Sequence, residues 1–290
     1  MSLKKRLLSK EFVVLAEMHT PKGVNISELV NNARRIKGRI DAVVIPDMDN
    51  GVMRMSALAG GVLMHQQGIE AVINVYCRDR NRMAIQGDIL AAHVLGIQNL
   101  IVVKGEEIAN CDHKDAKVVD DLDEIQILEV VSGLQNGTDM AGFDLAGAPE
   151  FTLGCTLGKF ADQASLEKEI QAAKQKVDAG ARFIITPPIF DIDYFLSAAD
   201  KIKALNVPVI ASVFLIKSVG IARYMAVTEP ESRIGEDLIK RIRKSRDREN
   251  ESLKIAGESI KALKGKVDGV LAVTLGWEHR LPTILDYAQL

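Results

Sequence analysis

Short runs of apolar, often β-branched residues alternate along the chain with longer amphipathic stretches. Such a run predicts a buried strand when polar or turn-forming residues bound it. Between the runs, apolar residues from Ile26 to Ile36 and from Ile192 to Leu205 recur at helical spacing. The eight predicted strands are Phe12–Ala16, Ala42–Ile45, Ala71–Val75, Leu100–Val103, Phe151–Gly154, Phe183–Thr186, Val207–Ser212 and Gly269–Thr274.

Eight strand-and-helix units over 290 residues are typical of a closed, parallel (β/α)8 TIM barrel, a fold of the α/β class. The alternative is an open doubly wound sheet, whose first strand usually leads into a GxGxxG turn. AEMHTPKG (Ala16–Gly23) follows the first strand here, so we favour the barrel. Residues 133–149 are rich in Gly, Asp and Asn and predict a loop rather than a linker, so we expect one barrel domain over residues 1–290. The mixed-charge run 240–250 predicts a solvated helix face.

Charge and composition exclude several classes of protein. With 37 Lys+Arg and 39 Asp+Glu, the net charge of −2 does not suit a nucleic-acid binder. The apolar run before Glu17 is too short for a signal peptide, and no run approaches the ~18 residues of a membrane span, so we expect a cytoplasmic protein. Cys77, Cys111 and Cys155 lack paired spacing and predict free thiols, and the absence of HxH and HExxH motifs predicts no metal site.

Candidate chemistry follows from the barrel prediction, because the active sites of such barrels form at the carboxyl ends of the strands. Acidic, basic and amide side chains converge there. The candidates are Glu17, Asp47, Cys77–Arg82, Lys104–Glu107, Cys155, Thr156, Pro187, Pro188, Lys217 and Leu275–Glu278.

Glu17 is the most informative of these, because it directly follows the apolar run FVVLA. A carboxyl group with little access to water has a raised pKa and can act as a general acid near neutral pH. The alternative interpretation is a carboxylate at the rim that pairs with a base such as Arg78 or Lys104. His19, two residues further on, is expected to line the barrel mouth.

Five blocks of sequence together resemble one family. In chain order they are AEMHTPKG (Ala16–Gly23), the block from CRDRN to KGEE (Tyr76–Glu107), DLDEIQIL (Asp121–Leu128), KVDAGARFIITPPIFD (Lys176–Asp191) and LGWEHRLPTIL (Leu275–Leu285). The chain resembles the methylenetetrahydrofolate reductases of bacteria, in the short form without a regulatory domain. That family has a flavin-bearing (β/α)8 barrel, which agrees with the fold predicted from the strands.

The resemblance implies reduction of 5,10-methylenetetrahydrofolate to 5-methyltetrahydrofolate. The implied cofactor is FAD, with FMN as the alternative, and the implied reductant is NADH or a protein donor such as an iron–sulfur partner subunit. A homo-oligomer is expected. The alternative function is a folate- or pterin-binding barrel subunit of a methyl-transfer or redox complex, without hydride chemistry of its own.

The resemblance also assigns residues. Glu17 matches the acid that opens the folate ring, and Glu106 matches a catalytic carboxylate near the flavin, where the family usually has aspartate. Pro187 stands where a glutamine binds the pterin, and Asn74 stands where well-studied members have a flavin-contacting histidine. The residues implied in flavin binding are Asn74, Lys104, Gly105, Glu106, Thr156 and Lys176, and those at substrate positions are Glu17 and Pro187.

Overall fold

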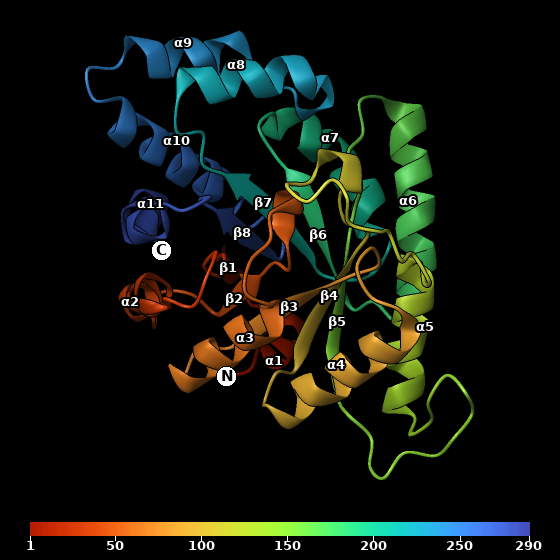
Figure 1. Ribbon diagram of the computed structural model, residues 1–290. Helices are drawn as coiled ribbons and strands as arrows, with labels where there is room; N and C mark the ends of the chain where they lie inside the picture. Colours follow the sequence, from red (N-terminus) through yellow and green to blue (C-terminus); the bar gives the residue numbers. More distant parts are fainter.

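A computed structural model describes residues 1–290 and shows eight parallel strands closed into a barrel in chain order (Figure 1). The first strand pairs with the last, Val13 opposite Gly269, which closes the sheet. The predicted (β/α)8 fold is therefore confirmed. The strands are β1 (Val13–Glu17), β2 (Ala42–Ile45), β3 (Ala71–Tyr76), β4 (Asn99–Val103), β5 (Thr152–Thr156), β6 (Phe183–Pro188), β7 (Val209–Phe214) and β8 (Gly269–Val273).

Helices surround the barrel, and several continue beyond its ends. The α-helices are α1 (Leu3–Leu8), α2 (Ser27–Ile36), α3 (Ala57–Gln66), α4 (Arg82–Val94), α5 (Glu124–Gln135), α6 (Gln163–Asp178), α7 (Ile192–Lys203), α8 (Val219–Thr228), α9 (Glu236–Lys244), α10 (Arg248–Leu263) and α11 (Leu281–Ala288). Four short 3₁₀ helices are η1 (Asp49–Gly51), η2 (Ile108–Asn110), η3 (Pro230–Ser232) and η4 (Glu278–Arg280). No helix is long and apolar enough to cross a bilayer.

Side chains alternate between the barrel interior and the helical layer, as the period of two in a strand requires. In β1, Val13 and Leu15 belong to the interior cluster, whereas Val14 and Ala16 pack in the helical layer. Leu3 and Leu7 of α1 also join the interior cluster, and they close the end of the barrel at which the strands begin. The alternation places the next odd residue of β1, Glu17, toward the interior at the opposite end.

Gly154 in β5 is required by the packing of the interior. A Cβ atom added there would lie 2.3 Å from Cζ of Phe183, which is fully buried. We expect Gly154→Ala to lower the free energy of unfolding by about 1–3 kcal/mol, because an overpacked core must shift its neighbours. Urea denaturation measures this change.

The matched control is Gly87→Ala on the exposed surface of α4, where an added Cβ meets nothing within 4 Å. Removing a helix-interior glycine there should stabilise the protein by about 0.5–1 kcal/mol. If Gly154→Ala were as stable as the natural protein, the close packing against Phe183 would be wrong.

Two local predictions meet different outcomes. The loop predicted over 133–149 forms after α5 ends at Gln135, at the end of the barrel where the strands begin (Figure 1). The run 240–250, by contrast, is not one helix, because α9 ends at Lys244 and α10 begins at Arg248. The Asp247 carboxylate caps α10 by accepting the N–H of Asn250, so local capping competes with a continuous helix.

Candidate active site

The loops that follow β2 and β4 lie side by side at the carboxyl ends of the strands. The N–H of Asp112, just after η2, donates to the carbonyl of Gly51 in η1 at 2.9 Å. Left-handed backbone at Met48 (φ 54°) and Asn50 (φ 55°) turns η1 back over the barrel mouth. Asp49 is thereby brought beside the end of β1.

Three titratable side chains meet at this point: Glu17, His19 and Asp49. His19 Nε2 lies 3.0 Å from Asp49 Oδ2 and 3.7 Å from Glu17 Oε1. All three side chains are at most 20% exposed. His19 lies just past the end of β1, and its imidazole turns toward both carboxyl groups.

Burial dominates the electrostatics of Glu17. Loss of water raises its pKa to about 7; the charge of His19 opposes that shift, and the carboxylates of Asp49 and Glu278 add to it. Glu17 forms no ion pair with Arg78 or Lys104, and its charged neighbour within 4 Å is His19. A carboxyl group with this pKa is partly protonated at neutral pH and can donate a proton.

The pKa of His19 is also raised, but burial acts on it in the opposite direction. Burial by itself lowers the pKa of His19, but its hydrogen bond to Asp49 and the charge of Glu17 outweigh burial, so the pKa lies above its ordinary value. The positive charge of Arg54 acts against this rise. The protonated form of His19 is therefore favoured more than that of a free imidazole.

Arg78 organises the loops after β3 and β4. Its buried guanidinium binds Asp79 in a fork, at 2.7 and 2.9 Å, and lies 3.2 Å from Glu106 Oε2. The other Glu106 oxygen accepts the N–H of Asn50 at 3.3 Å. Gly105 adopts φ 89°, and a Cβ atom there would approach the Tyr76 ring to 2.8 Å. The Glu106 carboxylate is thus held against η1, next to Asp49.

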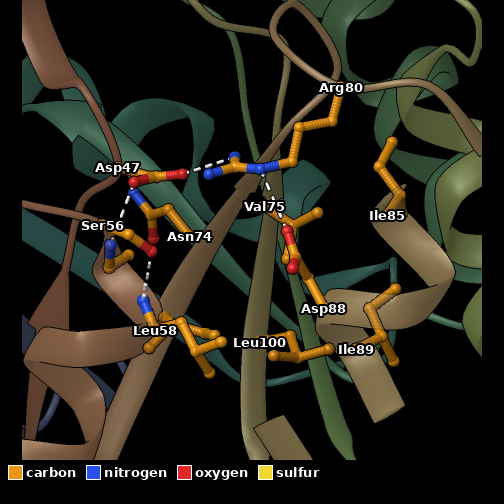
Figure 2. A pocket seen from close by; sticks show the side chains of 12 residues that line it. Asp47, Ser56, Leu58, Asn74, Val75, Arg80, Ile85, Asp88, Ile89 and Leu100 are labelled. Carbon is orange, nitrogen blue, oxygen red and sulfur yellow. Dashed lines mark hydrogen bonds and ion pairs between the residues drawn. The ribbon is translucent and has the colours of Figure 1, made fainter. Parts of the chain in front are cut away.

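A second ion pair, between the buried Asp47 and the partly exposed Arg80, fixes the loop after β2 to the loop after β3 (Figure 2). Asp47 Oδ2 accepts Arg80 Nη1 at 2.6 Å, and Oδ1 accepts the N–H of Ala57 at 2.9 Å, at the start of α3. Arg80 also reaches the more exposed Asp88 of α4 at 3.0 Å. The strand-end candidate Asp47 therefore has a structural role in the positioning of these loops.

The residues that the family resemblance assigns to flavin lie on β3, on β5, on α6 and directly after β4. The side chain of Asn74 faces the barrel interior, because Asn74 pairs with Ile101, a residue of the interior cluster. Its Oδ1 atom is buried without a hydrogen-bond partner. Lys104 follows β4, is exposed and forms no ion pair. Thr156 ends β5, and its carbonyl accepts Lys176 Nζ at 3.1 Å, while the same Nζ pairs with Glu124 at 2.6 Å.

Two further groups of strand-end candidates offer neither a charged side chain nor a side-chain hydrogen-bond donor suited to a ligand at neutral pH. Cys77 and Cys155 are buried free thiols, as predicted, and burial raises the pKa of each to about 12, so neither is a thiolate at neutral pH. Pro187 is the penultimate residue of β6, where the register with β7 is irregular. Its ring offers no donor at the position where the family has an amide.

A cavity of about 390 Å³ lies beside Glu17, between the loops after β1, β2 and β8. Its lining includes His19, Asn50, Arg54, Leu275 and Glu278. Sequence analysis placed Glu278 at a strand end but missed Asp49 and Arg54, because they lie in a loop whose path depends on non-local contacts.

Comparison with known proteins identifies a family. The family model described as methylenetetrahydrofolate reductase matches residues 2–288. Methylenetetrahydrofolate reductase 1 of Schizosaccharomyces pombe is 21% identical over 163 residues, or 52% of this chain and 23% of that protein. Methylenetetrahydrofolate reductase 2 of the same yeast is 23% identical over 243 residues, or 77% of this chain and 36% of that protein. The chain thus spans about a third or less of these relatives.

Solved structures share the fold at low sequence identity. An uncharacterised Clostridium thermocellum protein that binds two copies of 5-methyl-5,6,7,8-tetrahydrofolic acid superposes with a TM-score of 0.64 at 16% identity, covering 99% of this chain and 97% of that one. Riboflavin lyase with modified FMN and riboflavin superposes with a TM-score of 0.57 at 8% identity, covering 96% of this chain and 92% of that one. These similarities show the shared barrel.

Proposed function

Because the chain belongs to the methylenetetrahydrofolate reductase family, we propose that residues 1–290 form one catalytic barrel that reduces 5,10-methylenetetrahydrofolate to 5-methyltetrahydrofolate with a bound flavin. The proposal rests on one observation: the carboxyl group of Glu17 is buried at the barrel mouth, and burial raises its pKa to about 7. A barrel of this fold with a proton donor at its carboxyl end suits acid-assisted chemistry on a bound folate.

The residues of the mouth fit a flavin. The unpartnered Asn74 Oδ1 can accept an N–H of the isoalloxazine ring, which would satisfy this buried atom. Lys104 and Lys176 provide cations for the phosphates, and we propose FAD, with FMN as the alternative. Gly105 and Glu106 lie with Lys104 in the loop after β4, and Thr156 is the last residue of the neighbouring strand β5. When bound, the flavin supplies hydride to the folate; NADH or a protein donor, such as an iron–sulfur subunit, is the proposed reductant.

Glu17 supplies the proton that the chemistry needs. Its carboxyl group donates a proton to N10 of the folate, the bond between N10 and the bridging methylene carbon breaks, and the nitrogen keeps the electron pair as an N–H. The methylene carbon then becomes an N5 iminium, which accepts hydride to give the methyl group. Burial, helped by the neighbouring carboxylates of Asp49 and Glu278, raises the protonated fraction of Glu17 before the substrate arrives. Pro187 is the proposed substrate-side residue of β6; its ring offers no polar group, and its carbonyl accepts the Thr186 hydroxyl at 2.9 Å.

One observation favours the second candidate, a folate-binding barrel without hydride chemistry. Lys176, the proposed phosphate ligand, is already paired with Glu124 and is only 12% exposed. The Clostridium thermocellum relative in fold binds a methylated folate, the product in the proposed reaction. The visible spectrum of the purified protein, with and without added FAD, separates the two. Yellow protein that bleaches with a reductant supports the reductase, whereas colourless protein that binds 5-methyltetrahydrofolate and refuses flavin supports the binding protein.

Lys176 provides a sharper test of the flavin site. We expect Lys176→Ala to weaken FAD binding by about 10–100-fold, the effect of losing one charge-assisted hydrogen bond to a phosphate. The matched variant Glu124→Gln releases Lys176 from its pair and should bind FAD at least as tightly as the natural protein. Fluorescence titration of FAD measures both, and unchanged affinity in Lys176→Ala would overturn the assignment.

A further inference from the structure

Each catalytic cycle leaves Glu17 as a carboxylate that must regain its proton. We propose that His19 returns this proton, carrying it from the cavity beside β1 to Glu17, and that Asp49 holds the imidazole ring between transfers. This inference rests on the proposed function and adds a proton path to it. His19 is a positioning and relay residue, because it acts on Glu17 and not on the substrate.

The position of His19 between Glu17 and the cavity supports the path. His19 is among the residues that line the cavity of about 390 Å³, and Glu17 is not. The direction of β1 places the Glu17 carboxyl group on the interior side, where the substrate must lie for the proton to reach it. A bound substrate therefore covers Glu17 from the interior, and the polar route that remains runs through His19.

The distances suit a relay with a small movement. His19 Nε2 is 3.0 Å from Asp49 Oδ2 and 3.7 Å from Glu17 Oε1. A rotation that moves the nitrogen by about 1 Å exchanges the Asp49 contact for a hydrogen bond to Glu17. The Nε2 proton then passes to the Glu17 carboxylate, and the neutral imidazole takes a proton from water in the cavity. One proton enters from solvent for each proton given to N10, so the cycle balances.

The surrounding charges allow transfer in this direction. The groups that act on His19 are the Glu17 and Asp49 carboxylates, which favour the imidazolium, and Arg54, which opposes it. The groups that act on Glu17 are His19, Asp49 and Glu278, and the two carboxylates favour its protonated form. The pKa of Glu17 is raised to about 7 and that of His19 lies above its ordinary value, so an imidazolium is available beside the carboxylate that must regain its proton.

The test separates the first turnover from those that follow. In His19→Ala at pH 6, single-turnover reduction of methylenetetrahydrofolate by the pre-reduced protein should stay within about 3-fold of the natural rate, because Glu17 then starts mainly protonated. Steady-state kcat should fall by about 10–100-fold, because the carboxylate is re-protonated slowly. Imidazole added at increasing concentration should restore kcat by entering the space left by the ring.

The matched control is Glu17→Gln, whose lost activity imidazole should not restore. An unchanged steady-state kcat in His19→Ala at pH 6–8, or a lost kcat that imidazole leaves unaffected, would overturn the relay. If natural protein reduces no folate at all, the proposed function fails instead, so the two failures are distinct.

A measurement without flavin or substrate gives an independent readout. The imidazole resonances of His19 in the isolated protein should titrate with a pKa above the ordinary value for histidine, and Asp49→Asn should lower that pKa. Replacing the exposed His113 by glutamine identifies one of the other resonances and should leave the His19 titration unchanged. A His19 titration unaffected by Asp49→Asn would show that Asp49 does not hold the ring.

Discussion

Replacing Glu17 by glutamine should slow folate reduction by about 10²–10⁴-fold, the usual effect of removing a general acid. The amide has nearly the shape of the carboxyl group but cannot supply the proton that opens the folate ring. Reduction of the flavin by its donor needs no proton from Glu17, so that half-reaction should change by less than about 2-fold. Stopped-flow absorbance of the flavin measures the two half-reactions separately.

The pH dependence gives the same experiment a second readout. The protonated form of Glu17 is the active one, and its pKa is raised to about 7. The folate half-reaction should therefore be fastest below pH 7 and decrease as the pH rises through that value. In Glu17→Gln this decrease should disappear, because no titrating acid remains.

Glu129→Gln is the matched control, since Glu129 is an exposed glutamate of α5 that forms no ion pair. It should leave both half-reactions unchanged. An unchanged rate of folate reduction in Glu17→Gln would exclude Glu17 as the acid, and equal slowing of both half-reactions would indicate a merely structural role.

Replacing Asp47 by alanine should destabilise the protein by about 1–3 kcal/mol, the cost of leaving a buried backbone donor without its acceptor. Asp47 is 3% exposed. Its removal leaves the Arg80 guanidinium without its buried partner and the Ala57 N–H without an acceptor. Both losses occur where the loops after β2 and β3 are joined (Figure 2). Urea denaturation at neutral pH measures the change.

Asp88→Ala is the matched control, because Asp88 binds the same arginine but its side chain is 51% exposed. An ion pair in contact with solvent contributes about 0–1 kcal/mol, so this variant should be nearly as stable as the natural protein. Equal effects of the two substitutions would show that burial of Asp47 does not govern the stability of these loops.

The strands and the barrel could be predicted from the sequence because both follow from local patterns. Apolar runs of the right length mark the strands, and their regular alternation with helices leaves few ways to bury both faces of a parallel sheet. One predicted strand, Ala42–Ile45, matches the structure fully, whereas each of the others differs by one or two residues at one or both ends. β1 and β5 extend to Glu17 and Thr156 because a strand ladder requires backbone pairing and no particular side chain.

The sequence by itself determined the barrel, the family blocks and the position of Glu17 at a strand end. Only the tertiary structure decided what surrounds Glu17, because its neighbour Asp49 is brought to His19 across 30 residues by the left-handed backbone of η1. The pairs Arg78–Glu106 and Lys176–Glu124 likewise join residues 28 and 52 positions apart. The sequence of a strand shows which of its residues are buried, because apolar side chains recur on its buried faces. The path of a loop and the pKa of a buried carboxyl group depend instead on charges and contacts from distant parts of the chain, which no local pattern contains.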